Sequence, residues 1–205
     1  MCPNVGHKES ELDDWTCTAG MFCSDGGNGL DVWADLDTHA CSVGKYCPAG
    51  TTSELSCPAG TYNPVVGRSS LDDCLDADAG YYVSTTGASA VTGPCSEGYY
   101  CPSGSSIATQ LPCPVGRYRS IEYGAEPSDC AICKSGHYCS TTGLADPVIC
   151  PLGSYCPIGT IVPEPCPEGT YGAATGLTDS NSCTFCDAGY FCDEKGMVAA
   201  DLTTD

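Results

Sequence analysis

The chain has 205 residues, of which 19 are cysteine, 25 glycine and 15 proline, and its formal net charge is −19. Leu, Ile, Val and Phe together supply only 31 residues, fewer than an ordinary globular core contains. So many cysteines indicate a disulfide framework formed in an oxidising compartment, and we expect an extracellular or cell-surface protein. The acidic charge excludes nucleic acid as a partner, because a polyanion would be repelled.

The segment shows no membrane span, because no run of 18 apolar residues occurs. Its first residues, 1–7, have neither the basic nor the apolar region of a signal peptide. We therefore expect a piece of a longer secreted protein. The odd number of cysteines leaves Cys2 unpaired or intermolecular, with a partner outside this segment as the simpler reading.

Along the chain, the first recurring pattern is Cys-x-x-Gly-x-aromatic-Cys, here called the short motif. Its glycine supplies the positive φ of a rapid reversal, or lets a neighbouring backbone approach closely. Its aromatic ring can cover the sulfurs while a tyrosine hydroxyl stays in water. The short motif occurs at Cys17–Cys23, Cys41–Cys47, Cys95–Cys101, Cys133–Cys139, Cys150–Cys156 and Cys186–Cys192.

The second pattern, here called the long-loop motif, is Cys-Pro-x-Gly-x-Tyr closing on a cysteine after 16 enclosed residues: Cys57 to Cys74, Cys113 to Cys130 and Cys166 to Cys183. Successive long-loop motifs start 56 and 53 residues apart, so one unit has about 55 residues. This period predicts an N-terminal partial repeat with an insert, a repeat lacking one cysteine pair, a full repeat and a second partial repeat. The predicted boundaries are 1–56, 57–112, 113–165 and 166–205.

The fold class predicted from these patterns is small disulfide-rich repeats. Glycine or proline interrupts nearly every stretch of eight residues, and no helical periodicity is present. We expect an elongated array of short β-hairpins and loops with little or no helix, and a core made mostly of sulfur and tyrosine.

One unit bears on the disulfide connectivity. Ala77 and Val83 stand where the neighbouring units have Cys133 and Cys139. The joint loss of both cysteines favours pairing of neighbours throughout, because no partner is then orphaned. An interlocked arrangement, Cys133 with Cys150 and Cys139 with Cys156, remains the alternative.

The long-loop motifs, followed by Cys130-x-x-Cys133 or Cys183-x-x-Cys186, resemble the ephrin-receptor-like cysteine-rich repeats. They are also similar, more distantly, to tumour-necrosis-factor-receptor cysteine-rich modules. The resemblance covers residues 41–192. It implies a rod without catalysis, of the kind found in receptor ectodomains, matrix proteins and protist or algal surface proteins such as mastigoneme filaments.

Sites for chemistry are sparse. The Cys-x-x-Cys spacings match half of a zinc site, but every such cysteine has a repeat partner and the histidines are scattered. The acidic pairs Asp35 and Asp37, Asp72 and Asp73, and Asp76 and Asp78 have the oxygen ligands calcium prefers, yet read more simply as hydrated loops. We expect no catalytic residues, no metal site and no cofactor, and hence no enzyme.

Two functions remain open. The first is a structural protein whose stacked repeats form part of a filament, coat or flagellar appendage, with self-association or other extracellular structural proteins as partners. The second is a receptor-type ectodomain that binds a protein ligand, with Trp15 and Trp33 as candidate contacts. The near-uniform loops favour the first.

Overall fold

The computed structural model describes residues 17–23 and 40–202. They divide into two compact units. The first contains the described residues up to Ala77, with Val83–Thr92 and Gly104–Ser106, and the second contains Asp78–Tyr82, Gly93–Ser103 and the residues from Ile107 onward. The boundaries predicted from the 55-residue period stay a prediction.

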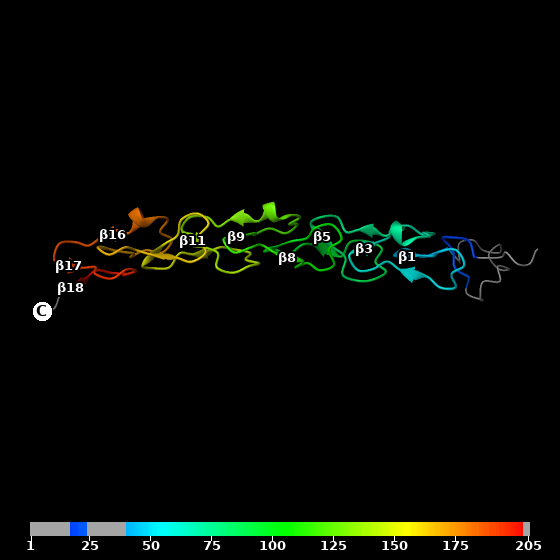
Figure 1. Cartoon of the computed structure of the whole chain (residues 1–205), viewed down its shortest axis with the longest axis horizontal. Helices are drawn as coiled ribbons and strands as arrows, with labels where there is room; N and C mark the ends of the chain where they lie inside the picture. The colour runs from blue at the N-terminus through cyan, green and yellow to red at the C-terminus, as the bar shows by residue number, and fades with distance from the viewer. Residues whose placement is uncertain (1–16, 24–39, 203–205) are drawn as a thin grey trace, which may run out of the picture. The chain divides into compact units, whose positions relative to one another are not determined.

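The described residues form nine two-stranded antiparallel sheets, each made of two-residue strands, and no α-helix (Figure 1). The predicted fold class, small disulfide-rich repeats of short hairpins, is confirmed. In every sheet the two strands are consecutive in the sequence. They are β1 (Lys45–Tyr46) with β2 (Leu55–Ser56), β3 (Thr61–Tyr62) with β4 (Leu75–Asp76), β5 (Tyr81–Tyr82) with β6 (Gly93–Pro94), β7 (Tyr99–Tyr100) with β8 (Leu111–Pro112), β9 (Arg117–Tyr118) with β10 (Ala131–Ile132), β11 (His137–Tyr138) with β12 (Val148–Ile149), β13 (Ser154–Tyr155) with β14 (Glu164–Pro165), β15 (Thr170–Tyr171) with β16 (Thr184–Phe185), and β17 (Tyr190–Phe191) with β18 (Asp201–Leu202).

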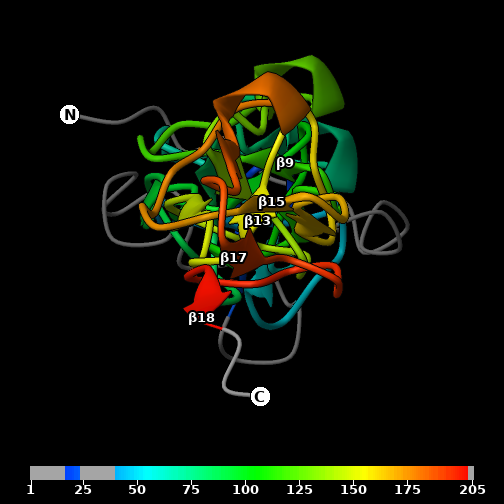
Figure 2. The ribbon, with the colours of Figure 1, turned by 90° about the vertical axis from the view of Figure 1, so that its left-hand side faces the viewer.

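Three 3-10 turns, which the sequence patterns did not predict, interrupt the hairpins. They are η1 (Leu71–Asp73), η2 (Pro127–Asp129) and η3 (Ser180–Ser182), and each directly precedes the second cysteine of a long-loop motif. Side chains cap their first turns, as where the Ser70 hydroxyl accepts a hydrogen bond from the Asp72 amide. Within the second unit, η2 and η3 project on the same side (Figure 2).

Hairpin turns recur at ten positions, here numbered motifs 1 to 10. Each numbered motif is a seven-residue turn with glycine at its fourth position. Six of them are the short motifs, and three are the first seven residues of the long-loop motifs. The remaining one, residues 77–83, has the same glycine and tyrosine without cysteines. The ten segments begin at Cys17, Cys41, Cys57, Ala77, Cys95, Cys113, Cys133, Cys150, Cys166 and Cys186. Three such motifs therefore fall within each 55-residue period.

Each motif is bound to the next by the same backbone hydrogen bonds. The glycine amide donates to the carbonyl of the last motif residue of the following motif, as from Gly136 to Cys156, at 2.7–2.9 Å. The glycine carbonyl accepts from the first residue of that motif, as from Cys150, at 2.8–3.0 Å. Both bonds occur at all nine steps of the described chain, and each lies within one compact unit.

Two further bonds complete every step. They come from the loop that follows the next motif, where a second glycine, or Tyr123 at the step from motif 5 to motif 6, donates to the first residue of the motif before, as from Gly159 to Cys133. The carbonyl after that second glycine accepts from the last residue of the motif before, as Thr160 accepts from Cys139. Four backbone bonds per step make a nearest-neighbour repeat architecture, in which each motif completes the one before it.

The motif glycines have φ between 73° and 94°, a conformation that other residues adopt with strain. The glycines of motifs 1 to 8 also lie close to the loop that follows the second motif further on: a Cβ on Gly136 would stand 2.6 Å from the carbonyl oxygen of Gly176. Both reasons that the sequence offered for glycine, reversal and close approach, therefore apply at this position.

The interior consists of sulfur. The fully buried apolar residues among those described are cysteines together with Ala77 and Val83. The motif tyrosines are only half-buried, so the expectation of a core shared between sulfur and tyrosine is correct for sulfur alone. Aliphatic side chains such as Val66, Ile121, Ile158 and Val162 are mostly exposed.

Candidate functional site

The described residues contain nine disulfides, and they link neighbouring cysteines of the sequence. Within each pair the Cα atoms lie 5.7–6.1 Å apart, which suits a disulfide. These are the neighbour pairs and not the interlocked ones. They are Cys17–Cys23, Cys41–Cys47, Cys57–Cys74, Cys95–Cys101, Cys113–Cys130, Cys133–Cys139, Cys150–Cys156, Cys166–Cys183 and Cys186–Cys192.

Motif 4 keeps the fold without a disulfide. Ala77 and Val83 are fully buried at the positions that cysteines occupy in the short motifs. The Ala77 amide donates to the Gly60 carbonyl, the Val83 carbonyl accepts from the Gly60 amide, and the Val83 amide donates to the Ser105 carbonyl. Eight of the nine hairpins thus hold a disulfide, and the ninth, β5 with β6, replaces it by apolar packing.

In the long-loop motifs the cysteine pairs across the loop, and a different residue ends the seven-residue turn. Asn63 fills this position in motif 3, where it is buried, donates its side-chain amide to the Lys45 carbonyl at 2.8 Å and accepts from the Val65 amide at 2.9 Å. Arg119 fills it in motif 6. These residues replace a covalent link by hydrogen bonds from a buried side chain.

The Arg119 guanidinium holds the second long loop together. It is nine-tenths buried and donates to the carbonyls of Asp129 and Glu122, each at 2.9 Å. Among the residues that the structure describes, its Nε has no hydrogen-bond partner. A planar donor with a fixed fork suits this role, because it spans two carbonyls of one loop.

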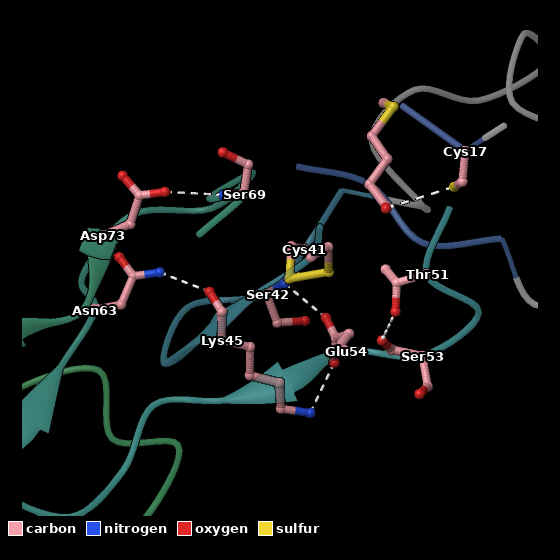
Figure 3. The surroundings of a disulfide bond; sticks show 12 residues. Cys17, Cys41, Ser42, Lys45, Thr51, Ser53, Glu54, Asn63, Ser69 and Asp73 are labelled. Carbon is pink, nitrogen blue, oxygen red and sulfur yellow. Dashed lines mark hydrogen bonds and ion pairs between the residues drawn. A yellow bond between two sulfur atoms is a disulfide. The ribbon is translucent and has the colours of Figure 1, made fainter. Parts of the chain in front are cut away.

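A small polar network surrounds the Cys41–Cys47 disulfide in the first unit (Figure 3). Glu54 accepts from the Lys45 ammonium at 2.7 Å and from the Ser42 amide at 2.6 Å. Burial opposes ionisation of Glu54, but the hydrogen bonds from Lys45 and Ser42 outweigh it and lower its pKa. The network stabilises the β1–β2 hairpin, and both oxygens of the Glu54 carboxylate are hydrogen-bonded within it.

Other shifted carboxyls also serve the fold. The pKa of Asp73 is lowered mainly because the Ser69 and Ser70 amides donate to its carboxylate, as Figure 3 shows for Ser69. The pKa of Asp129 is lowered in the same way by the Ala125 and Glu126 amides. These carboxylates therefore cap the turns η1 and η2.

The candidate metal positions that the structure describes are not assembled into a site. Cys130, Cys133, Cys183 and Cys186 are all in disulfides, so they offer no thiolate for zinc. Within residues 17–23 and 40–202, no group of three or more His, Cys, Asp or Glu side chains could hold a metal ion. Asp72 and Asp73 belong to η1, and Asp76 lies in β4.

Several candidate residues lie outside the described residues: Cys2, Trp15, Trp33, Asp35 and Asp37. Their predicted roles stay predictions. In the described ranges, no helix has the length and apolarity required to cross a membrane.

Comparison with known proteins gives two partial similarities, and no family model matches the chain. A 108-residue stretch is 31% identical to an ABC-type transporter, claG, of Penicillium crustosum, covering 48% of this chain and 14% of that protein. A 149-residue stretch is 28% identical to a mouse protein, sushi, von Willebrand factor type A, EGF and pentraxin domain-containing protein 1, covering 68% of this chain and 4% of that protein.

The chain thus spans only a small part of either relative, and each similarity concerns a segment of a much larger protein. Together with the nine disulfides, they describe a cysteine-rich repeat protein with many disulfide-stapled hairpins. Such a disulfide content indicates a protein of the secretory pathway that functions outside the cell.

Proposed function

We propose that the chain is an extracellular structural protein whose repeats form a rod within a filament, coat or flagellar appendage. The observation that supports this most is the identical four-bond step between successive motifs. A repeat of this kind can be extended without limit, because the same backbone amides and carbonyls form the hydrogen bonds at each step. The resemblance to repeats of protist and algal surface filaments points the same way.

The proposal includes a non-catalytic role. All eighteen described cysteines are in disulfides, so no thiol nucleophile is present among them. The ring of the one described histidine, His137, lies in hydrogen-bond distance of the Ser135 carbonyl, at 3.3 Å. The shifted carboxyls are engaged in caps and hairpins.

Electron microscopy of the purified, oxidised protein tests the proposal. Fibres or end-to-end chains of particles would support a structural role, and their loss after full reduction would show that the disulfides maintain the assembling form. Single particles at every concentration would contradict it. They would favour the alternative, a receptor-type ectodomain that binds a protein ligand.

A further inference from the structure

The second compact unit carries an exposed aliphatic surface, here called the aliphatic patch. Motif 6, strand β10 and the loop after motif 8 meet there, because the Cys133 amide donates to the Gly116 carbonyl and the Gly159 amide donates to the Cys133 carbonyl. A Cβ on Gly159 would stand 3.6 Å from Cγ2 of Ile132. A Cβ on Gly116 would stand 3.4 Å from Cγ1 of Ile161. The patch consists of the exposed aliphatic side chains of these three segments: Val115 (43%), Ile132 (49%), Ile158 (71%), Ile161 (43%) and Val162 (71%).

The preceding repeat shows that the fold does not require these side chains. Its backbone bonds are the same, since the Gly104 amide donates to the Ala77 carbonyl as the Gly159 amide does to the Cys133 carbonyl. The five corresponding positions carry mostly small or polar residues: Ala59, Asp76, Ser103, Ser106 and Ile107. The aliphatic side chains of the patch are therefore not a condition of the hairpin or of the step between motifs, and an exposed apolar surface of this kind marks a contact.

The exposure of the patch does not come from a missing neighbour in the series. Each motif is bonded to the next motif and to the loop after it, and its glycine lies close to the loop after the second motif further on. For motif 6 these neighbours are motif 7 and the loops after motifs 7 and 8, and the structure describes all of them. The patch is thus open although the motifs that contact it are present.

The border of the patch is basic, in a chain with 7 Lys and Arg against 26 Asp and Glu. Arg117 is the strand partner of Ile132, and Lys134 follows Ile132 by two positions and is exposed. The preceding repeat has Thr61 and Asp78 at the positions of these two cations. Two copies of so acidic a chain repel each other elsewhere, whereas this border attracts carboxylates.

The area of the patch fits a weak contact. From their exposed fractions, the five side chains present about 450 Å², as much as the largest apolar patches of soluble monomers, which are often functional. Two such patches face to face bury roughly 900 Å², less than the roughly 1,200 Å² of a stable interface. A contact of this size holds two isolated copies weakly and becomes effective when it is repeated along assembled chains.

We propose that the aliphatic patch is a docking surface for the aliphatic patch of a second copy of this chain. A two-fold contact is self-complementary, because the same aliphatic side chains of the two copies cover each other. The border cations Arg117 and Lys134 favour a partner rich in carboxylates, and a second copy is such a partner. This inference rests on the proposed structural function, for which it supplies a side-to-side contact.

The test compares the wild-type protein with Ile132→Asp and with a matched control, Val66→Asp. Asp76 has the position of Ile132 in the preceding repeat, so this repeat fold accepts the change. Val66 is 60% exposed and belongs to the first unit, and Glu122 has its position in the following repeat, so the control adds the same charge outside the patch. Circular dichroism verifies that both variants keep the native fold. Sedimentation velocity at protein concentrations up to millimolar, and electron microscopy, then measure association.

We expect Ile132→Asp to weaken association roughly tenfold or more, because each copy then places a carboxylate in a desolvated aliphatic contact. Val66→Asp should leave association unchanged. Methyl NMR gives a second readout, because three of the six isoleucines of the chain lie in the patch. The δ1-methyl signals of Ile132, Ile158 and Ile161 should shift as the protein associates, while those of the exposed Ile107 and Ile121 should not.

The outcomes separate the contact from the function. Wild-type association with equal effects of the two variants, or with none, overturns the docking surface and leaves the structural function standing. Dimers that depend on the patch and never grow into fibres support the docking surface and contradict the filament. A wild-type protein that stays monomeric at every concentration overturns both, and the patch then serves a different protein partner.

Discussion

Restoring the missing disulfide of motif 4 should stabilise that part of the chain. The double substitution Ala77→Cys and Val83→Cys places cysteines at two fully buried positions, with the sequence separation of 6 found in the short motifs. Closing a loop of about seven residues contributes about 2.3 kcal/mol on the chain-entropy treatment. Replacing the Val83 side chain costs about 0.5–1 kcal/mol of packing, so about 1.5 kcal/mol remains.

The measurement is native-state hydrogen exchange at the Gly60 and Gly80 amides, which donate to Val83 and to Cys101. About 1.5 kcal/mol corresponds to roughly tenfold slower exchange when local opening controls the rate. The double substitution to serine, Ala77→Ser and Val83→Ser, is the control, and it should speed exchange because it buries hydroxyls without a bridge. If mass spectrometry shows the new bridge closed and both amides exchange as in the wild type, the assignment of motif 4 as a cysteine-free copy of the short motif is refuted.

Four further outcomes follow from the described contacts. Tyr123 alone among the described non-glycine residues has positive φ, 66°, at a position that is glycine at the other steps, so Tyr123→Gly should be about 1 kcal/mol more stable than Tyr123→Ala in thermal unfolding. Arg119→Ala should cost about 1–3 kcal/mol by leaving two loop carbonyls unpaired, and Arg119→Lys should not restore the loss, as chemical denaturation of the two variants will show. Because Asp73 and Asp129 have lowered pKa values, their stabilisation is complete above their ordinary pKa of 3.8 and is lost as the pH falls through the lowered values; replacing both with Asn should flatten the melting temperature between pH 5 and pH 2. Partial reduction with alkylation should label cysteines in pairs six or seventeen residues apart, and pairs such as Cys133 with Cys150 would contradict the neighbour links.

Much of the fold follows from the sequence because the constraints are local. A glycine between two cysteines six residues apart requires a reversal, and the structure has a turn with positive φ at Gly98, Gly136 and Gly153. The joint replacement of two cysteines at residues 77 and 83 pointed to the neighbour links that the structure contains. Short hairpins, the absence of α-helix from the described ranges and a sulfur interior were predictable on the same grounds.

The hydrogen bonds between successive motifs were harder to predict from the sequence, because they are made by backbone groups that nearly every residue type carries. Cysteine spacing separates the long-loop motifs from the short ones, yet Gly116 and Gly136 make the same bonds to the motifs that follow. The signal that could have shown this equivalence was the glycine at the fourth position of all ten motifs, including the one without cysteine. The roles of Asn63 and Arg119 had no such signal, because a polar residue in a loop is ordinarily hydrated.

Disulfides and backbone hydrogen bonds stabilise different parts of the fold. A short disulfide closes only its own turn, since its cysteines lie six residues apart, and so no disulfide of this kind joins one motif to the next. Four backbone bonds per step join the motifs, and apart from the motif glycine they do not depend on a particular side chain. Motif 4 can therefore lose its disulfide without interrupting the series of steps, and mutation can change the exposed residues freely. The step between motifs therefore depends on the backbone and its glycines and does not require a disulfide in every motif.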